Sequence, residues 1–137
     1  MVIRGDASKA SIELSEQDGL RRPDGSEFYR VTLRENDFEA SIRVYAFDPA
    51  DNGLPKFFAG LAQDWKGWDG SRNWSSLEGE FELICEHDRV GHATTIATIH
   101  SNPLGLGWTG IIRFNIAVGE LDEIAEGVNR FFGKKTV

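Results

Sequence analysis

The spacing of apolar residues changes from a strand period to a helix period twice along the chain, and this constrains the fold most. Residues 29–45 alternate between apolar and polar side chains, which is typical of half-buried β-strands. The spacing then becomes helical, with an apolar stripe at Leu54, Phe57, Phe58, Leu61, Ala62 and Trp65. Residues 81–118 alternate again, and a second helical stripe follows at Leu121, Ile124, Ala125, Val128, Phe131 and Phe132. Because strands joined by short turns pair antiparallel, the sequence predicts an α+β fold.

The first alternating region predicts a β-hairpin with a defined register. Asn36-Asp37 lies between its two strands, and both side chains tolerate the positive φ that a two-residue turn requires. In this register Val31 faces Ile42. Together with an earlier strand at 11–15 and three more strands within 80–118, we expect one antiparallel sheet of about six strands. Both amphipathic helices are expected on one face of that sheet.

The order of elements suggests an internal repeat within a single domain of residues 1–137. Ser41-Ile42-Arg43-Val44 resembles Ile111-Ile112-Arg113-Phe114, and each segment precedes one of the two helical stripes. A duplicated βββα unit would give pseudo-repeat halves at residues 10–66 and 79–133. The alternative is that two amphipathic helices converged on one pattern.

The charge balance bears on the class of partner. Fifteen Lys and Arg residues stand against twenty-two Asp and Glu residues, which gives a net charge of −7. A nucleic-acid backbone requires clustered basic residues, so a basic protein is the partner that this charge favours. Met1–Ala10 has no apolar signal-peptide core, and no apolar run approaches the ~18 residues of a membrane span. We therefore expect a cytoplasmic protein without membrane contact, and the sequence indicates no cofactor.

The residues that could support catalysis or bind a metal are few. Cys85 is the single cysteine, which excludes a disulfide framework, and its alternating surroundings favour a small buried hydrophobe. His87, Asp88 and His92 form the one cluster that could transfer protons, and catalysis would need both histidines to converge on a cleft. His100 lies roughly 26 Å from His92 along one strand at ~3.3 Å per residue, so they cannot share a metal. We assign no catalytic residue and no metal site.

Tryptophans and acidic residues are the candidate binding residues. Trp65 belongs to the helical stripe and is expected in the core, whereas Trp68 and Trp74 lie in a polar, glycine-containing segment. They either clamp this segment onto the domain or form an interaction hot spot or a sugar-stacking platform. Alternation places three acids, Glu80, Glu82 and Glu86, on one strand face. This face is either a row of solvent-exposed carboxylates or a surface for a basic partner.

A second candidate surface lies on the other side of the first hairpin. The predicted register sets Arg30 opposite Arg43, and like charges directly opposite each other are destabilising. The pair therefore needs compensation from acids within the domain, from a homodimer mate or from a bound anion.

Several motifs resemble an uncharacterised bacterial family, domain of unknown function 6228. They are Trp65-Lys66-Gly67-Trp68, the segment from Trp74 to Leu83, His87-Asp88-x-x-Gly91-His92, and the closing Gly119-Glu120-Leu121-x-x-Ile124-Ala125. The resemblance extends over about residues 57–132. It implies no activity and no catalytic residue. At the level of class, the chain is also similar to small acidic immunity proteins that neutralise bacterial toxins.

Three functional hypotheses follow from these features. The first is a non-enzymatic binding module that contacts a basic protein through Glu80, Glu82 and Glu86, with Trp68 and Trp74 as anchors. The second is a small-ligand or carbohydrate-binding domain, which a concave pocket lined by Trp68 or Trp74 would favour. The third is an enzyme that uses the His87, Asp88 and His92 cluster.

Overall fold

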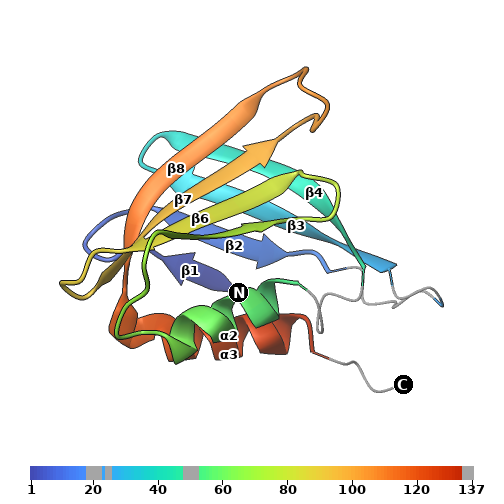
Figure 1. Ribbon diagram of the computed structural model, residues 1–137. Coiled ribbons are helices and arrows are strands. Elements are labelled where there is room, and N and C mark those ends of the chain that lie inside the picture. Colours follow the sequence, from blue (N-terminus) through green and yellow to red (C-terminus); the bar gives the residue numbers. More distant parts are fainter. Residues whose placement is uncertain (18–22, 24–25, 48–52, 134–137) are drawn as a thin grey trace.

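The computed structural model describes residues 1–17, 23, 26–47 and 53–133, and it contains two four-stranded antiparallel sheets (Figure 1). The N-terminal sheet consists of β1 (Val2–Arg4), β2 (Ser11–Ser15), β3 (Ser26–Glu35) and β4 (Phe38–Phe47), in that order. The C-terminal sheet consists of β5 (Ser71–Ser75), β6 (Phe81–His87), β7 (His92–His100) and β8 (Thr109–Ala117). Helix α2 (Leu54–Gln63) follows the first sheet. The 3₁₀ turn η1 (Val118–Glu120) and helix α3 (Leu121–Phe131) follow the second.

The predicted α+β class and antiparallel pairing are confirmed, but the single sheet of about six strands is wrong. The chain forms two sheets, and β1 and β5 are the strands that the pattern did not predict. Val2–Arg4 is only three residues long, and Ser71–Ser75 contains a single large apolar residue, Trp74. Neither segment is long or apolar enough for alternation to reveal it. Within the described residues, four strands and then an α-helix occur twice, in place of the predicted βββα unit.

The predicted register of the first hairpin is present, and a second hairpin forms between β6 and β7. Val31 pairs with Ile42, and the Glu35–Phe38 pair closes the two-residue turn, in which Asn36 has a φ of 48°. In the second half His87 pairs with Ala93, and the Asp88 amide donates to the His92 carbonyl over 2.9 Å. The loop between them holds Gly91 with a φ of 102°, a conformation that glycine adopts without steric cost.

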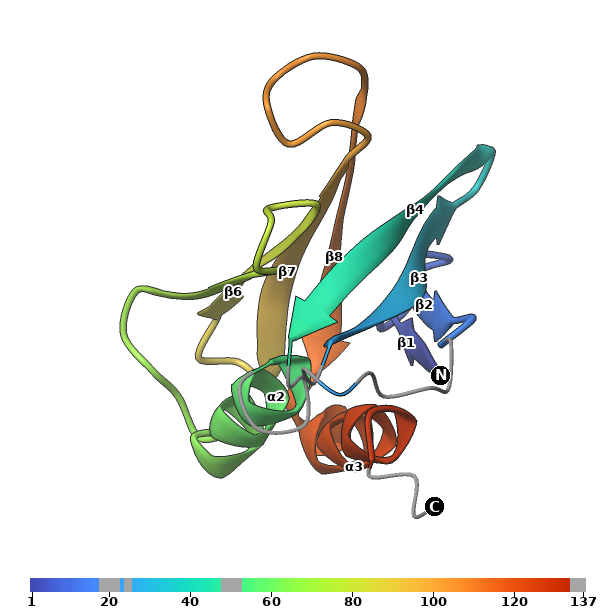
Figure 2. The same cartoon turned by 90° about the vertical axis from the view of Figure 1, so that its right-hand side faces the viewer.

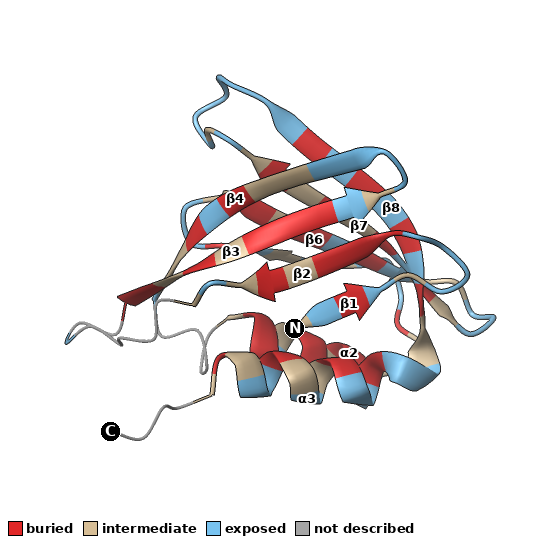
Figure 3. Cartoon of the chain, turned by 180° about the vertical axis from the view of Figure 1, so that it is seen from behind, coloured by how far each residue is buried: buried red, intermediate tan, exposed pale blue. Residues whose placement is uncertain are grey.

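The two sheets share one core, which the helices close at one end. In Figure 2 the helices lie side by side, with the two sheets rising from them. Strand β3 contacts β8, β4 contacts β7, and α2 packs against α3. The buried apolar residues of both sheets and both helices form a single cluster, and Figure 3 shows the buried positions alternating along the strands. Each sheet therefore buries one face.

Trp65 does not join this core. Helix α2 ends at Gln63, the Asp64 amide donates to the Gly60 carbonyl, and the Gly67 amide donates to the Asp64 carbonyl. The chain therefore turns before the apolar stripe reaches Trp65, which stays 49% exposed. The expectation of a buried Trp65 was wrong because helical spacing alone does not locate the end of a helix.

The carboxylate of Glu80 joins the two sheets. The backbone amide of Tyr45, on β4, donates to Glu80 Oε2 over 2.9 Å, and the Ser76 hydroxyl donates to Oε1 over 2.8 Å. Glu80 directly precedes β6, so its side chain connects the edge of the N-terminal sheet to the β5–β6 turn. The residue that the sequence placed on a solvated or partner-binding face thus forms a structural link.

We predict that Glu80→Ala lowers the free energy of unfolding by about 1–3 kcal/mol, because the Tyr45 amide and the Ser76 hydroxyl both lose a charged acceptor. Urea denaturation monitored by circular dichroism measures the change. Glu78→Ala is the matched control, since Glu78 is exposed in the same turn. Equal stability of the two variants would show that the link contributes nothing.

Candidate functional site

The outer face of the C-terminal sheet carries two of the predicted acids, Glu82 and Glu86. Along β6, Leu83 and Cys85 are buried, whereas Glu82, Ile84 and Glu86 point outward. Pairing extends this face over Thr94, Ile96 and Thr98 on β7 and over Ile111, Arg113 and Asn115 on β8.

Apolar side chains occupy the middle of this outer face. Ile84 pairs directly with Ile96, and Ile96 pairs with Arg113, which places Ile111 diagonal to Ile96. Ile84 and Ile111 are both exposed. Side chains on one face of neighbouring strands lie within contact distance, so the three isoleucines form one patch.

The acids of the outer face differ in their surroundings. Glu82 accepts a hydrogen bond from His100 Nε2 at 3.2 Å, whereas Glu86 is exposed and has no ion pair within the described part of the chain. On the N-terminal sheet, by contrast, Glu13 and Glu39 both contact Arg34 at 2.6 Å. Glu86 is thus an acid that no described basic residue pairs with.

The β7–β8 loop adds an exposed apolar cluster that the sequence reasoning treated only as a connection. Leu104 is 90% exposed and Leu106 is 76% exposed, and Trp108 follows them, also exposed. The Ser101 amide donates to the Trp108 carbonyl, and the Trp108 amide donates to the Ser101 hydroxyl over 2.8 Å. The signal available was the run of three large apolar residues between glycines in a loop.

Trp68 is part of the core, with 5% of its surface exposed. Its indole N–H donates to the Cys85 carbonyl over 3.2 Å, its ring meets His87 edge-on at 5.1 Å, and the Arg72 guanidinium lies 5.4 Å from the ring centre. Trp68 therefore clamps the α2–β5 segment onto the edge of the C-terminal sheet and offers no free surface to a partner.

Trp74 takes a different position. It lies half-buried on β5, opposite Leu83, and its ring packs edge-on against Phe81 at 5.5 Å. It also lines a cavity between the two sheets. Of the two candidate loop tryptophans, only Trp74 borders a space that a ligand could enter.

The histidines belong to separate hydrogen-bond sets. His87 Nε2 lies 2.8 Å from the Trp65 carbonyl and so donates to it, while Nδ1 accepts from the Arg89 amide. His92 lies between Asp88 and Asp6, and His100 lies between Glu82 and Thr109. Within the described residues no three potential metal ligands cluster.

Burial raises the pKa of the Cys85 thiol to about 11, although a hydrogen bond with Thr95 opposes this shift.

The opposed arginines are compensated within the domain. Arg30 pairs with Arg43 across β3 and β4, as predicted. The Arg30 guanidinium bonds to the Glu16 carboxylate and, over 2.9 Å, to the Ser41 hydroxyl. The Arg43 guanidinium stacks over the Phe28 ring at 4.2 Å from its centre. These contacts supply the compensation that the sequence reasoning required.

His92 fastens the β1–β2 loop to the C-terminal sheet. Its Nδ1 lies 2.9 Å from Asp88 Oδ2, and its Nε2 lies 3.2 Å from Asp6 Oδ2. The hydrogen bond with Asp88 is the main cause that raises the pKa of His92, and Asp6 adds to the shift. The pKa of Asp88 is lowered overall. Partial burial acts to raise it, but hydrogen bonds from the backbone amides of Val90 and His92 and from the His92 ring outweigh that effect.

We predict that His92 makes stability depend on pH. A raised pKa in the folded state means that the contribution is complete below the ordinary histidine pKa of about 6.5 and is lost as the pH rises through the folded value. His92→Gln should therefore destabilise the protein more at about pH 5.5 than at about pH 8.5, both above the range where Asp88 is protonated. Thermal unfolding at the two pH values measures this. An equal loss at both would contradict it.

Comparisons with known proteins identify a family. A model described as a family of unknown function (DUF6228) matches residues 3–135, which extends well beyond the region of the resemblance noted in the sequence. Searches of curated proteins and of solved structures found no match. Within the described residues no helix is long and apolar enough to cross a membrane. The chain thus belongs to the family of unknown function DUF6228.

Proposed function

We propose that this protein is a non-enzymatic binding module that contacts a basic protein partner through the outer face of the C-terminal sheet and the adjoining β7–β8 loop. The observation that carries the proposal is the exposure of Leu104 and Leu106 in the loop that joins β7, which carries Ile96, to β8, which carries Ile111. Large apolar side chains held in solvent on an ordered hairpin are typical of interaction sites.

The charge supports a basic partner. Glu86 has no ion pair among the described residues, Glu82 lies on the same face of β6 beyond Ile84, and the whole chain carries a net charge of −7. Complementary charge accelerates encounter, while buried apolar contacts supply most of the affinity. The isoleucines and the loop residues take the role of anchors, because Trp68 is buried.

An immunity-like role is one form of this proposal, in which the partner is a basic toxin in the cytoplasm of a bacterium. The small acidic chain suggests it by analogy. A gene for such a toxin beside this one would identify the partner to use in binding measurements.

We predict that Leu106→Asp lowers the affinity for a partner captured from the native cell by at least about tenfold, because a charge would be desolvated at the contact. Glu86→Lys should lower the association rate, and added salt should reduce that difference. Isothermal titration and surface plasmon resonance with the purified pair measure both effects.

Val90→Asp is the matched control, since Val90 is also exposed but lies in the β6–β7 loop at the other end of the strands. Affinity unchanged by Leu106→Asp and Glu86→Lys would exclude this face. If the wild type forms a dimer and Leu106→Asp dissociates it, the molecule that binds this face is a second copy of the chain and not a basic partner.

A further inference from the structure

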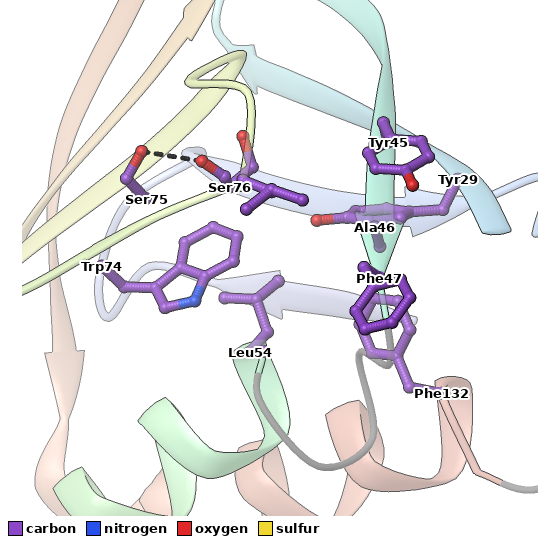
Figure 4. Close-up of a pocket in the computed structure, with 11 residues that line it drawn as sticks. Tyr29, Tyr45, Ala46, Phe47, Leu54, Trp74, Ser75, Ser76 and Phe132 are labelled. Carbon is purple, nitrogen blue, oxygen red and sulfur yellow. Dashed lines mark hydrogen bonds between the residues drawn. The ribbon is translucent and has the colours of Figure 1, made fainter. Parts of the chain in front are cut away.

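A cavity of about 210 Å³ lies between the two sheets, near the start of α2 and the end of α3 (Figure 4). Its walls are mainly aromatic and aliphatic. They include Tyr29, Tyr45, Phe47, Leu54, Trp74 and Phe132. Two large apolar lining residues, Phe47 and Leu77, have exposed side chains, so part of the apolar lining faces solvent.

The hydroxyl of Tyr29 is the unusual polar group of this cavity. Tyr29 is 2% exposed, and its hydroxyl has no hydrogen-bond partner among the residues that the structure describes. Figure 4 shows this hydroxyl pointing toward the space beside Trp74. Buried tyrosine hydroxyls usually have a partner, because an unsatisfied one loses its bonds to water without replacement.

The two serine hydroxyls at this cavity are already engaged. The Ser76 hydroxyl donates to Glu80 and accepts from the Phe81 amide over 3.0 Å. The Ser75 hydroxyl donates to the Ser76 carbonyl over 3.0 Å. Burial raises the pKa of Tyr29, and the charges of Glu80 and Glu27 raise it further. The hydroxyl therefore keeps its proton at neutral pH and is available as a donor.

The size and the charge of the surroundings define what could fill the space. At about 30 Å³ per water the cavity would hold roughly seven waters, and an apolar cavity of about 150 Å³ already accommodates benzene. The negative charges of Glu80 and Glu27 near the Tyr29 ring oppose an anion. A single neutral, largely apolar ring that offers one oxygen to the Tyr29 hydroxyl fits the size of the cavity, its negative surroundings and its hydrogen-bond donor.

We propose that this cavity is a binding site for a small, neutral and otherwise apolar ring compound whose single hydroxyl or carbonyl oxygen accepts a hydrogen bond from Tyr29. Aromatic walls surround the ring, and Tyr29 sets its orientation. The site goes beyond the proposed partner binding, because it uses the inner side of β5 and the ends of both helices in place of the outer face.

Phenol, toluene, benzoate and glucose are suitable probes for ligand-observed NMR and isothermal titration. We expect saturable binding of phenol, with toluene about tenfold weaker because it cannot accept the hydrogen bond. Tyr29→Phe should weaken phenol binding about tenfold and leave toluene binding unchanged. Benzoate and glucose should not bind.

Ala46→Leu provides a second variant at a half-buried cavity residue, in case Tyr29→Phe does not fold. It narrows the space and should weaken phenol and toluene alike. Leu106→Asp should leave phenol binding intact, which separates this site from the partner surface. The proposal is overturned if phenol does not saturate, if glucose or benzoate binds in its place, or if Tyr29→Phe binds phenol as the wild type does.

Discussion

The fold depends on one apolar core that both sheets share. Side chains of a β-strand alternate between two faces, so burying Leu83 and Cys85 in the shared core necessarily turns Ile84 and Glu86 outward. Helices α2 and α3 cover one end of this core and leave the outer face of the C-terminal sheet uncovered. The candidate partner surface is therefore a direct result of how the core is closed.

Local patterns determine what the sequence could predict. The register of Val31 against Ile42 followed from the two residues of the turn, because a hairpin fixes its own pairing. The division into two sheets did not follow, since it depends on contacts such as that between the Tyr45 amide and the Glu80 carboxylate, 35 residues apart. Alternation shows which face a residue occupies, but it does not show what covers that face.

The tryptophans illustrate the same limit at the candidate sites. Trp68 and Trp74 lie in one polar segment, and the sequence made both equally plausible as structural clamps or as binding residues. The Cys85 carbonyl holds the Trp68 indole inside, whereas Trp74 lies at the boundary of a cavity. Burying an indole ring is favourable when its N–H meets a hydrogen-bond acceptor inside the core. For Trp68 that acceptor, the Cys85 carbonyl, comes from strand β6, 17 residues later in the sequence. Only the tertiary structure separates a clamp from a ligand contact.

Stability alone does not explain the Tyr29 hydroxyl. Two other buried hydroxyls are paired: the Thr95 hydroxyl donates to the Ala93 carbonyl, and the Ser76 hydroxyl donates to Glu80. A phenylalanine at position 29 would make the same edge-on contact with Phe132, at 4.9 Å between ring centres, without removing a hydroxyl from water. An unpaired buried hydroxyl destabilises the fold, so the lack of a partner for Tyr29 among the described residues, beside an open cavity, supports the proposed ligand.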